Sequence, residues 1–181
     1  MNIEIIGVPL YYGCDNPGTQ QAYQIFCREG VQALREQQGH TVVSCREVQV
    51  PEEIEKHADP TMEYLQEVQI TCKNLEQAVA AAKDRGNFPL IIGGDHALGI
   101  GSVAGLSHTV PKEDLTVIWV DAHTDINTNE TSASHHIHGM PLAACLGLGS
   151  PKLIEGFGRG EAKLLPQNLF YIGSRSVDPG E

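Results

Sequence analysis

The chain has 181 residues, of which 41% are hydrophobic and 19% charged, a composition typical of one globular domain with its own core. Its 12 lysines and arginines stand against 23 acidic residues, which gives a formal net charge of −11. Because nucleic acids and anionic membranes are bound by clustered basic side chains, this balance argues against both as partners. A cationic small molecule suits the charge better.

Five cysteines are scattered along the chain without a Cys-x-x-Cys pair, which is typical of reduced thiols in a cytosol. The opening residues, Met1 to Ile6, show neither a basic stretch nor a long apolar run, so no signal peptide or membrane span is expected. We therefore expect a cytoplasmic protein.

Short β-branched runs bounded by glycine or proline predict five strands, in chain order residues 3–8, 41–44, 90–92, 116–120 and 169–172. Several are apolar at consecutive positions, which indicates strands that helices cover on both faces of a parallel sheet. Alternating strands and helices predict an α/β fold: a single domain over residues 1–181 with a central, doubly wound, mostly parallel sheet.

Between the strands, a helical pattern over Thr19 to Gln38 contains Gly30, where we expect it to divide. A clearer pattern begins at Leu65, with apolar residues three and four apart, and ends near Gly86 as a left-handed C-terminal residue. The polar or glycine-rich segments 127–138 and 147–160 are expected to be long loops.

The strand over residues 116–120 runs directly into Asp121-Ala122-His123-Thr124-Asp125. Side chains alternate along an extended backbone, so the two aspartates and the histidine are expected to converge on one side of it. The strand at residues 90–92 similarly ends in Gly93-Gly94-Asp95-His96. Because neighbouring parallel strands end at one edge of a sheet, where open α/β folds bind ligands, we expect His96 to join the cluster.

Two imidazoles and two carboxylates combine borderline and hard donors, a mixture that favours Mn²⁺, Fe²⁺ or Zn²⁺. A carboxylate such as Asp121 can bridge two ions. The alternative is that His96 and His123 are ordinary polar residues at strand ends. The occurrence of two ligand-bearing motifs in one chain favours the metal.

These motifs resemble those of the ureohydrolase family, and within it the bacterial-type arginases rather than the agmatinases. The resemblance includes Gly93-Gly94-Asp95-His96, Asp121 to Asn127 and Ile137-His138-Gly139-Met140-Pro141. It extends from Ile5-Ile6-Gly7-Val8-Pro9 to Val177-Asp178-Pro179-Gly180-Glu181, and so spans the chain. The resemblance implies an arginase-like fold of three layers, α/β/α.

It also implies manganese-dependent hydrolysis of L-arginine to L-ornithine and urea by a hydroxide that bridges two Mn²⁺ ions. Asp121 would bridge the ions, His96 and Asp125 would bind one, and His123 the other, with Asp125 also orienting the hydroxide. His138 would shuttle protons between the site and solvent. The substrate's α-amino and α-carboxylate groups would be held by Asn127, Ser134, His136, Asp178 and Glu181. A homo-oligomer, either a trimer or a hexamer, is implied as well.

The sequence departs from the family pattern in three places, one of them Ser176, which stands where the family often has an acidic residue. Ser134-His135-His136 stands where the family has Ser-Gly-Asn, and an imidazole does not reproduce the paired donor and acceptor of an amide. The family's later Asp-x-Asp metal motif is absent, so the second ion keeps only His123 and Asp121.

We therefore expect a fold truncated on its C-terminal side, with an uncovered sheet edge, and a chain that alone binds one ion weakly and has little activity. Two alternatives remain open: a ureohydrolase of agmatine or another guanidino compound, and an inactive truncated subunit.

Overall fold

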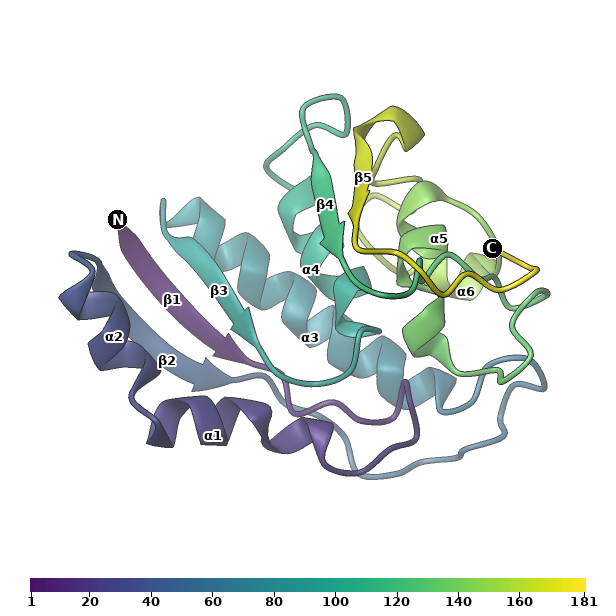
Figure 1. Cartoon of the computed structure of the whole chain (residues 1–181), viewed down its shortest axis with the longest axis horizontal. Coiled ribbons are helices and arrows are strands. Elements are labelled where there is room, and N and C mark those ends of the chain that lie inside the picture. The colour runs from purple at the N-terminus through teal and green to yellow at the C-terminus, as the bar shows by residue number, and fades with distance from the viewer.

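In the computed structural model, which describes residues 1–181, strands alternate with helices as the sequence predicts (Figure 1). The strands are β1 (Asn2–Gly7), β2 (Thr41–Glu47), β3 (Phe88–Ile92), β4 (Val117–Val120) and β5 (Leu169–Ile172). The α-helices are α1 (Ala22–Arg28), α2 (Val31–Gln37), α3 (Leu65–Asp84), α4 (Leu98–Ser107), α5 (Pro141–Leu146) and α6 (Pro151–Ile154). The 3-10 turns are η1 (Thr19–Gln21), η2 (Ile137–Gly139) and η3 (Pro166–Asn168).

The strands form two parallel sheets, one in the order β2-β1-β3 and one made of β4 and β5. The expectation of parallel pairing is confirmed, but that of a single continuous sheet is wrong, because β3 and β4 do not pair. β3 contains Pro89, which has no N–H to donate to a neighbouring strand.

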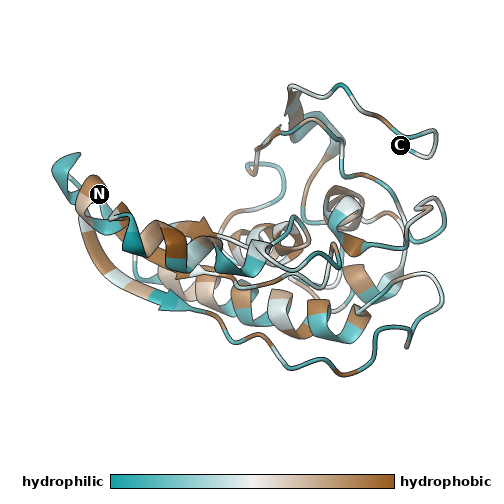
Figure 2. Ribbon diagram, turned by 60° about the horizontal axis from the view of Figure 1, so that its bottom comes forward, coloured by the Kyte–Doolittle hydropathy of each residue, from teal (hydrophilic) through white to brown (hydrophobic).

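Helices cover both faces of the larger sheet, which confirms the α/β/α layering. On one face Ile6 and Val8 join the core cluster of α3 and α4. On the other face Ile3 and Ile5 pack with Tyr23 of α1 and neighbouring residues of α2. Apolar residues stand at consecutive positions of β1 because both of its faces are buried. Along the helices apolar and polar stretches alternate, as expected of helices with one buried side (Figure 2).

Glycines allow α3 and α4 to pack closely. A Cβ atom at Gly101 would lie 2.4 Å from the carbonyl oxygen of Cys72, and one at Gly105 would lie 2.6 Å from the Cβ of Val79. This packing fixes α4, which follows β3 after a short connection, and so helps to position the residues of that connection.

Several local predictions are confirmed. Helices α1 and α2 are separated by Gly30, whose φ is +85°, and α3 ends before Gly86, whose φ is +72°. The prediction of an uninterrupted loop over 147–160 is wrong, because Ser150 accepts a hydrogen bond from the backbone N–H of Lys152 and caps α6 there. Short capped helices of this kind give little periodic signal.

One face of the β4–β5 pair is uncovered. Its apolar side chains, all more than half exposed, are Ile118, Val120, Phe170 and Ile172. Both strands of this pair also have an unpaired edge. None of the helices combines the length and apolar composition that crossing a membrane requires.

Candidate functional site

His96 lies just after β3, on a turn that only glycine can make. Gly93 and Gly94 have φ of +95° and +79°, and a Cβ at Gly94 would lie 2.6 Å from the carbonyl oxygen of Val8. The buried Asp95 closes the turn, with one carboxylate oxygen accepting from Ala97 N (2.9 Å) and the other from Gly13 N (2.9 Å). Burial raises the pKa of Asp95. The sequence therefore fixes the backbone on either side of His96.

Asp121 and Asp125 both reach this histidine. The His96 Nδ1 atom lies 2.8 Å from Oδ2 of Asp125 and 2.9 Å from Oδ2 of Asp121. The three side chains form a compact group whose ligand atoms lie within 4.8 Å of one another. The structure thus brings the strand-end motifs together although β3 and β4 do not pair.

The path that brings the aspartates together differs from the extended one expected from the sequence. Beyond Val120 the chain bends, and Asp125 adopts a left-handed conformation with φ of +48°. The bend is fixed from the segment around β5: the Ala122 carbonyl accepts from Arg175 N and Ser176 N (both 2.9 Å), and Tyr171 Oη donates to the Thr124 carbonyl (2.9 Å). Burial raises the pKa of Tyr171 to about 12, so its hydroxyl remains a donor.

His123 does not join this group, contrary to the expectation for an extended backbone. Its side chain is 62% exposed, and its Nδ1 lies 3.5 Å from Oδ1 of Asp121. Its backbone N–H donates to the same Oδ1 atom (3.0 Å). The bend leaves its imidazole exposed beside Asp121, outside the compact group.

The electrostatics of the cluster favour a cation. Burial raises the pKa of Asp121, but the His123 N–H and the adjacent imidazoles outweigh it, and the net pKa is lowered. The hydrogen bond with Asp125 raises the pKa of His96, against the opposing effect of burial. No lysine or arginine pairs with either carboxylate. The His96 imidazole lies against both acids.

A pocket of about 190 Å³ adjoins the cluster and gathers the other predicted site residues. It is lined by His123, Asp125, Asn127, Ser132, Ala133, Ser134, His136, His138, Gly139, Asp178 and Glu181. Only His96 and Asp121 of the predicted set are missing from this lining, and they lie beside Asp125. No lysine or arginine lines the pocket, whereas three acidic residues do.

The tail of the chain completes this pocket. Asn127 Nδ2 donates to Asp178 Oδ2 (3.3 Å), and the backbone N–H of Asp178 donates to Glu181 Oε2 (2.9 Å). The other oxygen of Glu181 accepts from Ile126 N (3.4 Å). Ser134 Oγ accepts from His136 N (3.3 Å). The residues predicted to bind substrate therefore also hold together the chain segments that line the pocket.

His138 is oriented by the backbone. Its Nδ1–H donates to the Gly13 carbonyl (2.9 Å), which also accepts from the His138 backbone N–H (3.0 Å). Its Nε2 is then the nitrogen available for proton transfer. Asp95, Gly13 and Tyr171 were not predicted as site residues. Asp95 is adjacent to His96 in the motif, but its buried backbone contacts depend on tertiary structure.

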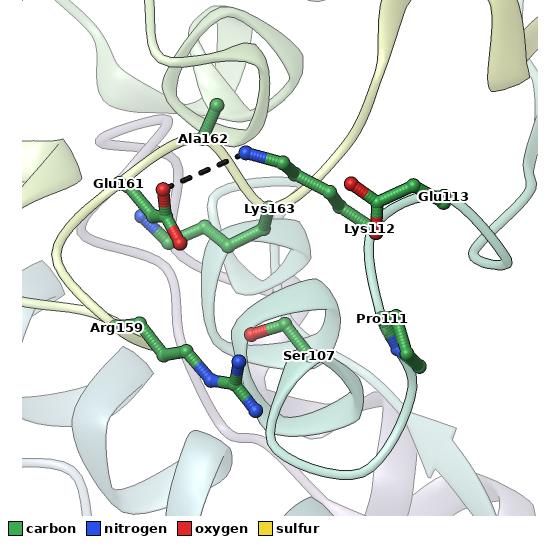
Figure 3. A pocket seen from close by; sticks show the side chains of 8 residues that line it. All are labelled: Ser107, Pro111, Lys112, Glu113, Arg159, Glu161, Ala162 and Lys163. Carbon is green, nitrogen blue, oxygen red and sulfur yellow. Dashed lines mark ion pairs between the residues drawn. The ribbon is translucent and has the colours of Figure 1, made fainter.

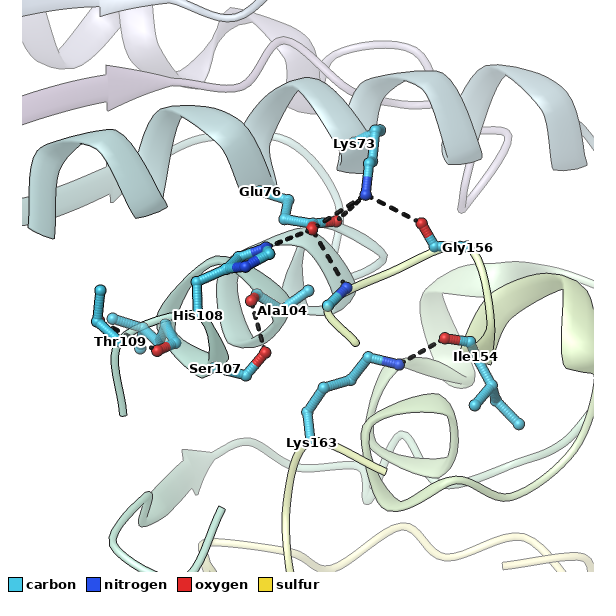
Figure 4. A network of polar contacts seen from close by, with 11 residues as sticks. Lys73, Glu76, Ala104, Ser107, His108, Thr109, Ile154, Gly156 and Lys163 are labelled. Carbon is cyan, nitrogen blue, oxygen red and sulfur yellow. Dashed lines mark hydrogen bonds and ion pairs between the residues drawn. The ribbon is translucent and has the colours of Figure 1, made fainter. Parts of the chain in front are cut away.

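Two other groups of acids and histidines are already neutralised. Asp15, Glu63 and His136 form a second compact set, but Lys56 Nζ lies 2.6 Å from Asp15 Oδ2 and 3.5 Å from Glu63 Oε2. Glu76 accepts from Lys73 Nζ (3.0 Å) and Gly158 N (3.2 Å), and lies 2.7 Å from His108 Nε2 (Figure 4). In each group a lysine ammonium supplies a positive charge beside the carboxylates.

A separate pocket lies at the opposite ends of β4 and β5, where Ser107, Lys112, Arg159 and Lys163 face a hollow of about 170 Å³ (Figure 3). Lys112 pairs with Glu161 (3.5 Å), and the buried Lys163 donates to the carbonyl of Ile154 at the end of α6 (2.6 Å). The ammonium of Lys163 thus stabilises a helix terminus.

The chain is similar to known proteins over nearly its whole length. The model of the arginase family matches residues 1–181. The chain is 38% identical to the arginase of Bacillus caldovelox, covering 99% of this chain and 60% of that protein, and is similar to its crystal structure with a TM-score of 0.91. It is 30% identical to the arginase of Entamoeba histolytica solved with L-ornithine, covering 99% of this chain and 59% of that one, with a TM-score of 0.83. The chain spans about 60% of the length of these relatives, and since the family model matches every one of its residues, it belongs to the arginase family.

Proposed function

We propose that this chain carries part of the active site of a manganese-dependent hydrolase that converts L-arginine to L-ornithine and urea. The observation that carries the proposal is the convergence of His96, Asp121 and Asp125, without a lysine or arginine, at the wall of the pocket that holds His138. Relatives named arginase, one of them solved with L-ornithine, support this substrate.

The donor set fits a divalent ion such as Mn²⁺, because it combines one imidazole with two carboxylates. His96 and Asp125 would hold one ion, Asp121 would be shared, and His123 would hold a second. When bound, such ions lower the pKa of water toward neutrality and supply a nucleophile for the guanidinium carbon.

The chain's own residues orient the substrate and move protons. The acidic pocket attracts a guanidinium cation, and Asp178 and Glu181 face its tail with Asn127, Ser134 and His136. His138, held at Nδ1 by the Gly13 carbonyl, offers Nε2 to transfer a proton to the leaving amine. We further propose a cytoplasmic location, a small-molecule partner rather than nucleic acid or a membrane, and a homo-oligomer, trimer or hexamer.

A second candidate substrate is agmatine or another guanidino compound without a carboxylate. The observation that favours it is the charge of the pocket: three acidic residues and no lysine or arginine line it. A tail bearing only an amine is attracted by these charges, whereas a carboxylate is repelled.

The test is urea release from L-arginine and from agmatine by the Mn²⁺-loaded protein as isolated from its source. We expect the reaction to be abolished by Asp125→Asn and unaffected by Glu130→Gln, a change of equal charge on an exposed loop residue. Equal activity of the Asp125→Asn variant and the wild type would exclude this site as the catalytic centre. An inactive subunit would release no urea from either compound.

A further inference from the structure

The protein forms hydrogen bonds with only one nitrogen of the His96 ring. Nδ1 lies against the carboxylates of Asp121 and Asp125, whereas Nε2 has no hydrogen bond to another residue. In metal sites the histidine nitrogen that does not bind the ion usually donates to a carboxylate or a backbone carbonyl, and this bond orients the ring. The protein provides no such bond for His96, whose side chain is 52% exposed. Its orientation therefore depends on packing.

The ring of His96 packs against Trp119 of β4. The two ring centroids lie 5.3 Å apart and the ring planes are inclined by 75°, a T-shaped arrangement of the kind that aromatic rings prefer. His96 follows β3, and β3 does not pair with β4, so no backbone ladder fixes the two strand ends relative to each other. The contact between the rings thus links the strand end that carries His96 to the strand that leads into Asp121 and Asp125.

Trp119 is itself fixed by the elements around it. A Cβ atom at Gly99, in the first turn of α4, would lie 3.1 Å from Cη2 and 3.5 Å from Cζ3 of the indole. The same Cβ atom would lie 3.3 Å from Cβ of Pro141, the first residue of α5. In the backbone, Trp119 is paired with Tyr171 of β5. The indole is therefore held between a sheet and two helices, and can hold the imidazole in turn.

Trp119 acts through its shape rather than through a hydrogen bond. Its Nε1 atom is buried and has no hydrogen-bond partner in the protein. Its neighbours Ile118 and Val120 are on the exposed face of β4, so Trp119 is on the opposite, inner face. Phenylalanine at this position would keep an aromatic ring without removing a hydrogen bond, whereas leucine would remove the ring.

We propose that Trp119 is a positioning residue for the metal ligand His96. By packing against the imidazole it keeps Nδ1 turned toward Asp121 and Asp125, so that the three ligand atoms lie within 4.8 Å of one another. Ligands that are already in place bind an ion more tightly, because they do not have to be ordered when the ion arrives. This role rests on the proposed metal-dependent function, and it belongs to a residue outside the ligand set.

The first test measures the contact in ion-free protein. Trp119 is the only tryptophan among the 181 residues, so its fluorescence is the difference between the spectra of the wild type and Trp119→Phe. An imidazole packed against an indole quenches its fluorescence. We therefore expect this difference to be larger in a His96→Gln background and unchanged in a His57→Gln background, since the side chain of His57 is exposed and distant from β4 in the chain. An unchanged difference in the His96→Gln background overturns the proposal.

The second test measures Mn²⁺ dissociation constants by electron paramagnetic resonance. We expect Trp119→Leu to weaken binding by about tenfold, at the lower end of the effect of outer contacts in metal sites, and Trp119→Phe to recover most of that loss. The matched control is Phe157→Leu, which replaces a buried aromatic ring in the segment after α6. It should lower the free energy of unfolding, as Trp119→Leu does, and leave the dissociation constant unchanged.

Mn²⁺ binding by Trp119→Leu as tight as that of the wild type contradicts the positioning role, and so does an equal loss of affinity in Phe157→Leu. Failure of the proposed function gives a different result. If the wild type and the variants bind Mn²⁺ as expected, but the wild type releases no urea from L-arginine or agmatine, the proposed reaction is wrong and the role of Trp119 is supported.

Discussion

Two regions of this molecule place a histidine against carboxylates, and they differ in what completes the set. Glu76 is 2% exposed, and its oxygens are satisfied by Lys73, His108 and the backbone N–H of Gly158. Asp121 and Asp125 share one imidazole and pair with no lysine or arginine, and Asp125 lines a pocket. The first arrangement has its cation built in and ties α3 and α4 to the segment after α6 (Figure 4). The second concentrates negative charge that an external cation can neutralise.

The largest effect is expected from a substitution in the proposed metal site. Asp121→Asn leaves His96 with one carboxylate and removes the oxygen that both ions would share. We expect Mn²⁺ affinity to fall by more than about 100-fold, since even the outer contacts of a metal site contribute 10–100-fold. Titration of Mn²⁺ followed by electron paramagnetic resonance measures this, with Glu76→Gln as the matched control. Equal loss of affinity in the control would mean that the two regions are not functionally distinct.

Replacing Glu76 should instead lower stability. In Glu76→Gln the ammonium of Lys73 and the imidazole of His108 lose their carboxylate partner. Removing one member of a buried ion pair costs about 3–5 kcal/mol, and the half-exposed Lys73 reduces this here to about 2 kcal/mol. Urea denaturation gives the free energy of unfolding, and Mn²⁺ affinity should be retained. A fully stable variant would show that the network does not hold the segment after α6.

The smallest effect concerns a further satisfied carboxylate, Glu4, which is buried in β1 and accepts two hydrogen bonds from Arg85 (both 2.8 Å). Hydrogen bonds from Arg85 lower the pKa of Glu4 to about 2, against the opposing effect of burial. Because the folded pKa is below the unfolded one, the stability gained is complete above about pH 4.5 and is lost as the pH falls toward 2. We expect solvent around the half-exposed Arg85 to reduce this contribution to about 1 kcal/mol at pH 7.

The measurement is the free energy of unfolding at pH 7 and pH 3 for the wild type and Glu4→Gln. The variant should lose less stability on acidification than the wild type. Parallel curves would show that Glu4 is not responsible for this part of the pH dependence.

The β4–β5 pair has an exposed apolar face as well as the uncovered edge that the sequence predicts. Its four large side chains, Ile118, Val120, Phe170 and Ile172, are the outward members of alternating positions. Because apolar residues stand at consecutive positions of both strands, the sequence predicts that both faces are buried. The tertiary structure buries only one of them.

Much of the fold follows from local pattern. The five strands, the division at Gly30 and the end of α3 before Gly86 depend on side-chain branching, periodicity and left-handed glycines, which act over a few residues. The short helices α5 and α6 were missed because they span only six and four residues, too few for a period to show.

By itself, the sequence determined the chemistry of the site: His96, Asp121 and Asp125 as adjacent donors, and His138 and His136 on one loop. Only the tertiary structure decided their geometry. It bent the chain at Asp125 through contacts from β5, left His123 exposed beside Asp121, and placed Trp119 against His96. These outcomes depend on contacts between residues that are far apart in the chain. The free energy of such a contact is set by packing in the folded protein, and the spacing of residues within a motif does not reveal it.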